Sequence, residues 1–354
     1  MHWRCVVSPP TPPLLPGDTW PLLTGGLDSA GQELDTVELY GLECAVPKLP
    51  VGVYFDTTFQ TADDHIVGCG GNLGHRCRTL GPSGWKSGPV GDLTQERYGA
   101  TAVTTAVGTY VLGGVNKVAQ LSSDFLPRHA TSFETGPKIP YQLYRGCATN
   151  LDSTSFLVTG GNISHYNASD GSWGMDWEKL RQGRERHACA AYGRIGSSDF
   201  DYQWVIVAGG SKYSYDHEYA LTSTEIIDLA RKTVVDGPEM ATARSHFHVI
   251  RVERDGVEAV LALGGWSHSS TCLDKVEVFL VEEGRWEERA RLGEARQNYE
   301  GLAVRVNESL VCVGESGGGL EEGGGQEGGE EGGAQGQGAG PLGPLVFNPE
   351  GTIP

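Results

Sequence analysis

The sequence predicts an all-β repeat fold in which each unit forms four short strands. Three features recur in phase: an apolar run that ends in Gly-Gly, an alternating segment that follows it, and an Arg ahead of the next apolar run. The first glycines of successive pairs are 45, 43, 47, 49, 55 and 50 residues apart, counting SLVCVGE as a last member that has lost its second glycine. Such near-equal spacings indicate one structural unit per period.

The apolar run before each Gly-Gly, such as TYVLGG or VIVAGG, is expected to form strand b of its unit. A continuous apolar run of this length is typical of a strand that is buried on both faces. Glycine at the end of the strand tolerates a positive φ and the close approach of another backbone. The repeat glycines are Gly25, Gly26, Gly70, Gly71, Gly113, Gly114, Gly160, Gly161, Gly209, Gly210, Gly264 and Gly265.

The segments around each strand b complete the unit. Alternating segments such as DTVELY and DKVEVFLV predict a strand c with one exposed face. The aromatic or Gly-Pro segments that follow predict strand d, where Trp85, Trp177 and Trp286 can cover the face of a neighbouring unit. The small and apolar residues after each phased Arg, as in RYGATAV, predict strand a.

Together these features resemble the kelch repeat. The resemblance covers about residues 18–314, and TSTEIIDLARKTVVDGPEMATARSHF is close to the family pattern of strand c, strand d and the following Arg. It implies a β-propeller of four-stranded antiparallel blades around a central channel. In this family the b–c and d–a loops gather at one face and frame the channel mouth.

The strands favour six blades, with seven as the alternative. The first unit begins at strand b, and the later segment EGLAVRV supplies a strand a that completes it and closes the ring. Seven blades would need PLVFNPEG (344–351) as a further strand and would still lack two. We divide the chain into a Pro-rich leader (1–17), the propeller (18–314), a disordered Gly/Glu-rich segment (315–343) and a short tail that could form a strand (344–354).

The phased arginines precede strand a and, by the resemblance, would form a broken ring of guanidinium groups at the channel mouth. Such a ring suits carboxylate or phosphate ligands through bidentate hydrogen bonds. The alternative is that each Arg bonds loop carbonyls or an acidic residue of a neighbouring blade. The expected ring is Arg97, Arg145, Arg186, Arg244 and Arg296, and further candidates for the same face are Asn72, Asn116, Asn162, Lys212 and Trp266.

No local motif indicates a metal centre or a catalytic site. His246 and His248 alternate on one strand and His268 lies near Cys272, but no loop supplies the three or four convergent ligands of a zinc site. The chain contains no GxSxG, HExxH or phosphate-loop motif. We therefore expect no catalytic residue, metal or cofactor, although galactose-oxidase-like copper enzymes and sialic acid epimerases share the fold.

Composition bounds the partners and the compartment. The formal net charge is −18 without a basic block, which argues against nucleic acid and anionic membranes, and no apolar run is long enough to span a bilayer. The N-terminus is a poor secretory signal, so we expect a cytoplasmic protein, or an extracellular one if the start of the chain is incomplete. Eight cysteines without a CxxC favour reduced thiols over a disulfide framework, whereas sequons at Asn162, Asn167 and Asn307 point the other way.

Three functions remain open from the sequence alone. The first is a protein-interaction scaffold or adaptor that holds a partner, expected to be an acidic segment, on the loop face. Kelch proteins of this kind bind ubiquitin-ligase or cytoskeletal components. The second is a propeller enzyme that acts on a sugar, and the third is a secreted or cell-surface adhesion-type propeller. We favour the first, because Arg repeats at phased positions of the loops and no catalytic motif accompanies it.

Overall fold

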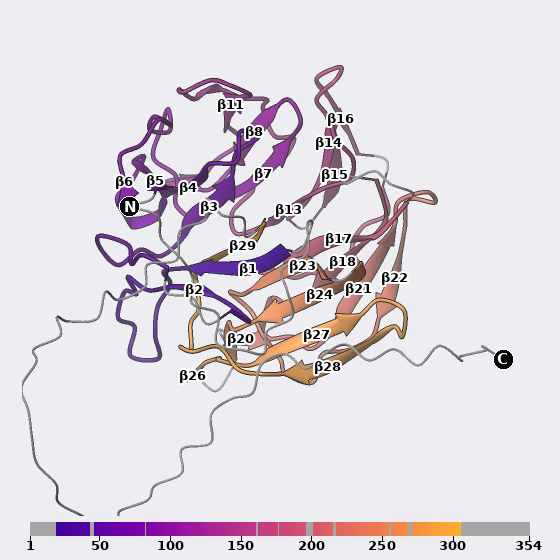
Figure 1. Cartoon of the computed structure of the whole chain (residues 1–354). Helices are drawn as coiled ribbons and strands as arrows, with labels where there is room; N and C mark the ends of the chain where they lie inside the picture. The colour runs from indigo at the N-terminus through magenta and orange to yellow at the C-terminus, as the bar shows by residue number, and fades with distance from the viewer. Residues whose placement is uncertain are drawn as a thin grey trace, which may run out of the picture.

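Six antiparallel sheets surround a common centre in the computed structural model, which describes residues 19–305 except 43–45, 82, 161, 176, 196–200, 215–216, 255 and 268–270. Figure 1 shows the sheets as the blades of a propeller, with strand a of each blade nearest the centre. The predicted all-β propeller with six blades is thereby confirmed. Within the described residues, no helix has the length and apolar character needed to cross a membrane.

The blades follow one another along the chain, and blades 2 to 6 each run from strand a at the centre to strand d at the rim. Blade 1 consists of β29 (Glu300–Arg305), β1 (Thr19–Thr24) and β2 (Val37–Leu39) within the described residues. Blade 2 consists of β3 (Asp56–Gln60), β4 (Ile66–Gly70), β5 (Cys77–Gly81) and β6 (Gly84–Lys86). Blade 3 consists of β7 (Thr101–Thr105), β8 (Gly108–Leu112), β11 (Ser123–Pro127) and β12 (Glu134–Thr135).

The second half of the ring repeats this order. Blade 4 consists of β13 (Cys147–Asn150), β14 (Ser155–Thr159), β15 (Ile163–Asn167) and β16 (Ser172–Gly174). Blade 5 consists of β17 (Ala188–Arg194), β18 (Tyr202–Ala208), β21 (Thr224–Asp228) and β22 (Thr233–Gly237). Blade 6 consists of β23 (His248–Arg254), β24 (Val257–Leu263), β27 (Val276–Leu280) and β28 (Arg285–Arg289).

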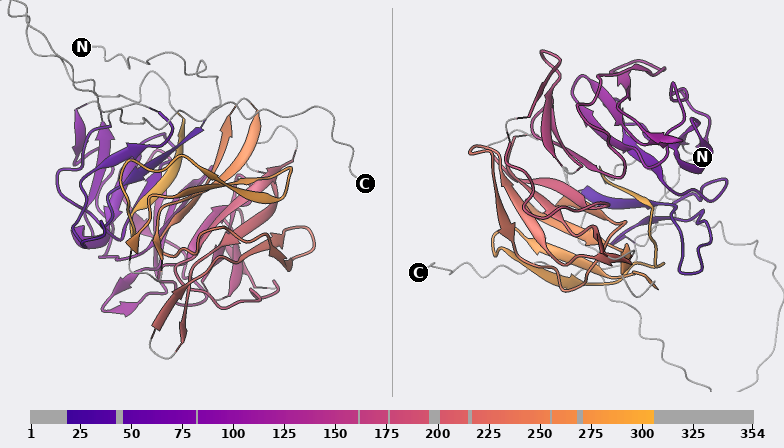
Figure 2. Two further views of the ribbon diagram at one scale, coloured as in Figure 1. Left: turned by 90° about the horizontal axis from the view of Figure 1, so that it is seen from below. Right: turned by 180° about the vertical axis from the view of Figure 1, so that it is seen from behind.

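Short elements fill the b–c loops at one end of the propeller. Blade 2 has the 3₁₀ turn η1 (Gly71–Leu73), and three blades have two-stranded ribbons: β9 (Val115–Asn116) with β10 (Val118–Ala119), β19 (Ser211–Ser214) with β20 (His217–Ala220), and β25 (Trp266–Ser267) with β26 (Thr271–Cys272). The β19–β20 ribbon of blade 5 projects from this end of the molecule (Figure 2). Of these described ribbons, the one of blade 5 has the longest strands.

The ring is closed by pairing between the two ends of the propeller. β29 is antiparallel to β1 along its whole length, from Thr24↔Glu300 to Thr19↔Arg305. The prediction that EGLAVRV supplies strand a of the first blade is thus confirmed. This pairing covers the inner edge of β1, which would otherwise be open. SLVCVGE and PLVFNPEG lie outside the described residues.

The hydrophobic core is divided among the interfaces between neighbouring blades. Six buried clusters are found among the described residues, and each combines side chains from two adjacent blades. Between blades 5 and 6, Ile206 and Val260 belong to one such cluster and are fully buried. At the rim, Trp286 packs against this cluster and donates its indole N–H to the carbonyl oxygen of Pro238 at 3.1 Å. Each blade is therefore stabilised mainly by its two neighbours.

The Gly-Gly pairs end strand b where the loop to the next blade crowds against it. Gly113 has a φ of +65°, and a Cβ there would lie 2.2 Å from the carbonyl oxygen of Leu143. Gly209 has a φ of +57°, and a Cβ there would lie 2.5 Å from the carbonyl oxygen of Arg244. A side chain at these positions would push the neighbouring loop away. Gly161 lies outside the described residues.

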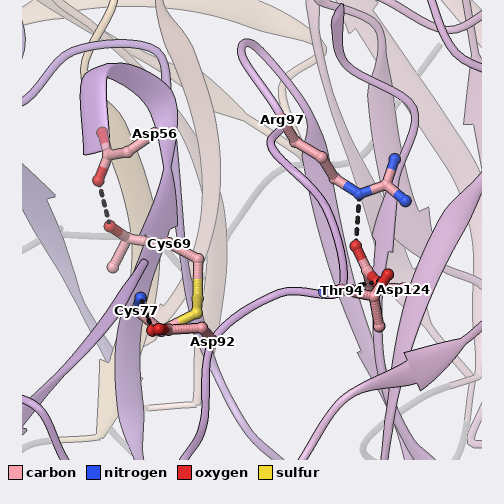
Figure 3. Close-up of a disulfide and its surroundings, with 8 residues drawn as sticks. Asp56, Cys69, Cys77, Asp92, Thr94, Arg97 and Asp124 are labelled. Carbon is pink, nitrogen blue, oxygen red and sulfur yellow. Dashed lines mark hydrogen bonds and ion pairs between the residues drawn. A yellow bond between two sulfur atoms is a disulfide. The ribbon is translucent and has the colours of Figure 1, made fainter. Parts of the chain in front are cut away.

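Within the described residues, two disulfides replace the reduced thiols that we expected. Cys69 and Cys77 are paired residues of β4 and β5 and form one disulfide within blade 2 (Figure 3). Cys147 and Cys189 form the other between the inner strands β13 and β17 of neighbouring blades. The expectation was wrong because apolar strand sequences do not reveal which cysteines face each other across strands. Cys272 is a buried free thiol, and Cys5, Cys44 and Cys312 lie outside the described residues.

Removal of β29 should open the ring. A chain that ends at Tyr299 loses every β1–β29 pair and exposes the inner edge of β1, so we expect its melting temperature to fall by roughly ten degrees or more. A chain that ends at Gly314 retains β29 and every other strand that the structure describes, so it should melt like the full chain. Thermal unfolding followed by circular dichroism makes the comparison, and equal melting of the two truncated chains would contradict the closure.

Candidate functional site

One residue in the left-handed region of backbone space lies just before strand a in every blade. These residues have φ values between 52° and 65° and line the entrance of the central cavity: Phe55, Gly99, Arg145, Arg186, His246 and Asn298. Residues other than glycine rarely adopt this conformation. Its recurrence in all six d–a loops therefore indicates a shared constraint, and we call these six residues the mouth ring.

Backbone hydrogen bonds join the mouth ring into a collar. The N–H of Arg145 donates to the carbonyl of Gly99 at 3.0 Å, and the N–H of Gly99 donates to the carbonyl of Phe55 at 2.9 Å. The N–H of Phe55 donates to Asn298 at 3.1 Å, and the N–H of Asn298 donates to His246 at 3.1 Å. The collar surrounds a cavity of about 680 Å³ that the inner strands line. The mouth ring is thus a fixed frame that holds six side-chain positions at one entrance.

Four other arginines lie two positions before a mouth-ring residue and form the internal frame of their blades. Arg97 shows the arrangement: its Nε donates to Asp124 at 2.5 Å (Figure 3). Its Nη1 donates to the carbonyl of Gly113 at 2.6 Å. Asp124 is the second residue of strand c, and Gly113 is the first glycine of the Gly-Gly pair. The guanidinium therefore ties the d–a loop to strands b and c of its own blade.

The same contacts recur in three more blades. Arg184, Arg244 and Arg296 pair with Glu225, Glu277 and Glu38, which are again the second residues of strand c, and they donate to the carbonyls of Gly209, Gly264 and Gly25. The side chains of all four frame arginines are no more than 1% exposed. We call them the frame arginines.

Three of the five arginines predicted for the loop face belong to this frame, which corrects the prediction. Arg97, Arg244 and Arg296 are buried, and carbonyl and carboxylate groups already accept from them. The alternative drawn from the sequence describes them better, except that each acid belongs to the same blade. The frame position and the mouth-ring position lie two residues apart, and both can carry an Arg shortly before strand a. The sequence repeat alone did not distinguish them, so the prediction treated them as one position.

Arg145 and Arg186 are the two arginines that the mouth ring does contain, and they come from the neighbouring blades 4 and 5. Arg145 is partly buried, and its Nε is buried without a hydrogen-bond partner. Burial lowers the pKa of its guanidinium and the charge of Arg186 lowers it further, whereas Tyr144, Tyr98 and the more distant charge of Glu218 raise it, and the arginine stays protonated. Among the described residues no carboxylate lies within ion-pair distance of Arg145.

The third member of this cluster is a neutral imidazole. Arg145 Nη1 lies 3.0 Å from His246 Nε2, and because Arg can only donate, Nε2 is the acceptor. The proton of the imidazole is then on Nδ1, which lies 2.9 Å from Ser245 Oγ. Burial, together with the charges of Arg186 and Arg145, lowers the pKa of His246 to about 3. His246 therefore adds no charge to the mouth at neutral pH.

The charge of Arg186 is paired with a carboxylate that lies outside the mouth ring. Arg186 forms an ion pair with Glu218, which is carried by β20 of the b–c ribbon of blade 5. The other carboxylate oxygen of Glu218 lies 3.9 Å from His246 Nδ1. Of the two mouth arginines, Arg186 therefore has an internal carboxylate and Arg145 has none among the described residues.

Aromatic rings surround Arg145, the mouth arginine without an ion-pair partner among the described residues. The Arg145 guanidinium carbon lies 3.9 Å from the centre of the Phe55 ring and 4.7 Å from the centre of the Tyr144 ring, which are cation–π distances. Tyr98 packs against Phe55 with ring centres 4.7 Å apart, and Tyr54 packs against Tyr98 edge-on at 5.7 Å. Tyr144 is 37% exposed, so this aromatic cluster is open to a ligand.

The remaining residues predicted for the face lie on the b–c loops but contribute unequally. Trp266 stacks edge-on against His246 with ring centres 6.2 Å apart, so it borders the mouth. Asn72 donates to Glu33 at 3.0 Å and links the loops of blades 1 and 2. Asn116 lies on β9, the carbonyl of Asn162 accepts from Tyr141, and Lys212 is exposed on β19. None of these three contacts the mouth ring in the interactions described.

The cavity below the mouth ring holds a second polar pair. His248 Nε2 lies 3.5 Å from Glu300 Oε1, and both residues line the cavity. Burial alone would lower the pKa of His248, but the Glu300 carboxylate raises it above its ordinary value. In the part of the chain that the structure describes, no three His, Cys, Asp or Glu side chains are grouped so as to hold a metal ion.

Sequence reasoning missed Phe55 and Asn298 as companions of the mouth arginines, and it missed Glu218. One usable pattern was present. The blades whose strand c has an acid at its second position also have the frame arginine, whereas blade 4 has Ser164 there and Leu143 in place of the arginine. That pattern separates Arg145 from the frame arginines. No local pattern places Glu218, because it reaches the mouth from a ribbon.

Comparison with known proteins adds support for the fold. No family model matches the chain, and no curated protein matches it. A solved structure of YjhT is similar to this chain with a TM-score of 0.56 and 11% sequence identity, covering 74% of this chain and 89% of that chain. At this identity the likeness concerns the arrangement of the blades and carries no function.

Replacement of a frame arginine should cost far more stability than replacement of a mouth arginine. Arg244→Met leaves Glu277 buried without its partner, so we expect a loss of about 3–5 kcal/mol in the free energy of unfolding. Arg145→Met leaves no described carboxylate without its ion-pair partner, so the free energy of unfolding should fall by about 1 kcal/mol or less. Urea denaturation of both variants measures the difference. Arg244→Met/Glu277→Leu should recover part of the loss, and equal losses for the two single variants would refute the division.

Proposed function

We propose that this propeller is a protein-interaction scaffold that binds an acidic segment of a partner protein at the mouth ring, with a carboxylate of the partner on Arg145. The observation that carries the proposal is that, among the described residues, no carboxylate lies within ion-pair distance of the partly buried Arg145 guanidinium, whereas every frame arginine has one. Buried charges in proteins are normally paired, because an unpaired one loses its hydration without compensation. A carboxylate from another molecule would provide the missing pair.

The surroundings of Arg145 favour a protein ligand. Tyr54, Phe55, Tyr98 and Tyr144 form an aromatic cluster beside the guanidinium. Tyr, Trp and Arg dominate the energetic centres of protein interfaces, because they combine a large contact area with a polar group. The acidic residue of the partner would therefore be flanked by apolar or aromatic side chains that pack on this cluster.

Charge distribution makes the mouth selective. The chain carries a formal net charge of −18, so most of its surface repels acidic proteins. The mouth ring presents two guanidinium groups against one carboxylate, that of Glu218. An acidic segment thus finds a local positive site on a negatively charged molecule, and this supports specific rather than diffuse binding. A ubiquitin-ligase or cytoskeletal component as the partner rests on the kelch resemblance alone.

A random peptide library panned on the purified full chain tests the proposal. We expect the selected peptides to share an Asp or Glu beside an aromatic or apolar residue. Arg145→Gln should weaken the selected peptides about tenfold or more, because a close charge pair is lost. Fluorescence polarisation with labelled peptides measures the dissociation constants.

Arg231→Gln is the matched control. Arg231 lies on the c–d turn of blade 5 and its side chain is 77% exposed, so the substitution removes the same charge away from the mouth. Its affinity for the selected peptides should equal that of the wild type. Retention of full affinity by Arg145→Gln, or selection of peptides without acids, would refute the proposal, and an unchanged melting temperature shows that each variant is folded.

A secreted or cell-surface form of this scaffold is favoured by the two disulfides. Stable disulfides are typical of oxidising compartments and rare in the reducing cytosol. Cys147–Cys189 links the inner strands of blades 4 and 5, which carry Arg145 and Arg186. The sequon at Asn167 lies where β15 ends in a turn, with Ser169 exposed, which gives an enzyme access to the asparagine.

Expression through a secretory pathway should give a chain with both disulfides and a glycan on Asn167. We expect peptide mapping without reduction to recover Cys69 linked to Cys77 and Cys147 linked to Cys189, and we expect deglycosylation to convert Asn167 to Asp. Complete alkylation of all four cysteines without a reductant would exclude the secreted form. Asn167→Gln serves as the control, because it should abolish the mass shift at this site.

A further inference from the structure

The ribbon of blade 5 brings a carboxylate into the mouth from outside the ring. Glu218 lies on β20, pairs with Arg186 and approaches His246 at 3.9 Å. Its side chain is only 19% exposed, and the backbone of β20 is held by its pairing with β19. Hydrogen bonding from Arg186 lowers the pKa of Glu218 although partial burial opposes this, so the group is ionised at neutral pH. A negative charge is therefore a fixed part of the mouth.

The two mouth arginines therefore differ, because Glu218 forms an ion pair with Arg186 and not with Arg145. Arg145 lies against the neutral His246 and aromatic rings, and Glu218 acts on it from beyond ion-pair distance. His246 separates the two, since its Nε2 faces Arg145 and its Nδ1 is on the side of Glu218. A ligand carboxylate on Arg145 would be attracted by one guanidinium, and a second ligand carboxylate nearby would meet the charge of Glu218.

We propose that Glu218 acts as an internal carboxylate that keeps ligand carboxylates away from Arg186. The mouth ring is thereby restricted to ligands that present a single acidic group to Arg145. The inference rests on the proposed binding of an acidic segment and names its chemistry. Removal of the Glu218 charge would take this carboxylate away from Arg186 and would favour ligands with two adjacent carboxylates, as in an Asp-Asp or Glu-Glu pair. A fixed like charge is a common means of rejecting the wrong partner.

The test compares the peptides selected by the wild type and by Glu218→Gln from one random library. Wild-type peptides should carry one required acid, with a second adjacent acid giving no gain. Peptides selected by Glu218→Gln should carry two adjacent acids and should bind that variant about tenfold more tightly than the wild type. Glutamine preserves the size of the side chain, and the melting temperature of the variant checks that the ribbon and blade are intact.

A second variant assigns the effect to Arg186. In Glu218→Gln/Arg186→Gln both charges of the pair are absent, so we expect the preference for a single acid to return. If the wild type selects acidic peptides and Glu218→Gln selects the same peptides with the same affinities, the role of Glu218 is refuted while the binding proposal stands. If no variant selects acidic peptides, both are refuted. Equal gains for Glu218→Gln and the double variant would also overturn the assignment, because the gain would not depend on Arg186.

Discussion

The buried ion pair between a d–a loop arginine and the second residue of strand c is the interaction on which the rest of this propeller depends. In four blades the guanidinium also donates to the carbonyl of the first Gly-Gly glycine, so one side chain joins a loop and two strands. In these four blades the residue two positions later lies in the left-handed region and belongs to the mouth ring, and Phe55 and Arg145 adopt the same conformation in the two blades without a frame arginine. The frame arginines thus anchor four of the six loops that carry the mouth ring.

Blade 4 differs from the four blades with a frame arginine, because its only phased arginine lies in the mouth ring. It has Leu143 in place of the frame arginine and Ser164 in place of the acid, so its loop is held by packing instead of charge. Its arginine, Arg145, stands in the mouth ring without a carboxylate among the described residues. A charge that the fold does not use for its own stability is free to serve binding. The same residue type therefore has opposite roles at two positions that lie two residues apart.

Blades 4 and 5 are the most specialised part of the ring. They carry both mouth arginines, and the disulfide between Cys147 and Cys189 joins their inner strands directly below them. Blade 5 also carries the ribbon with Glu218. The other blades supply uncharged ring positions, namely Phe55, Gly99, the neutral His246 and Asn298. Charge recognition is therefore concentrated at one side of a nearly symmetric mouth.

The sequence by itself determined the repeat, the four strands of each unit, the six blades and the closure by EGLAVRV, because these follow from periodicity and hydrophobic pattern, which are local. It also placed Arg145 and Arg186 near the mouth, but it could not separate them from Arg97, Arg244 and Arg296. Only the tertiary structure decided which guanidinium groups point into a blade and which cysteines meet across strands. It also placed Glu218 at Arg186. These outcomes depend on contacts between segments that are far apart along the chain, and a local pattern does not record them.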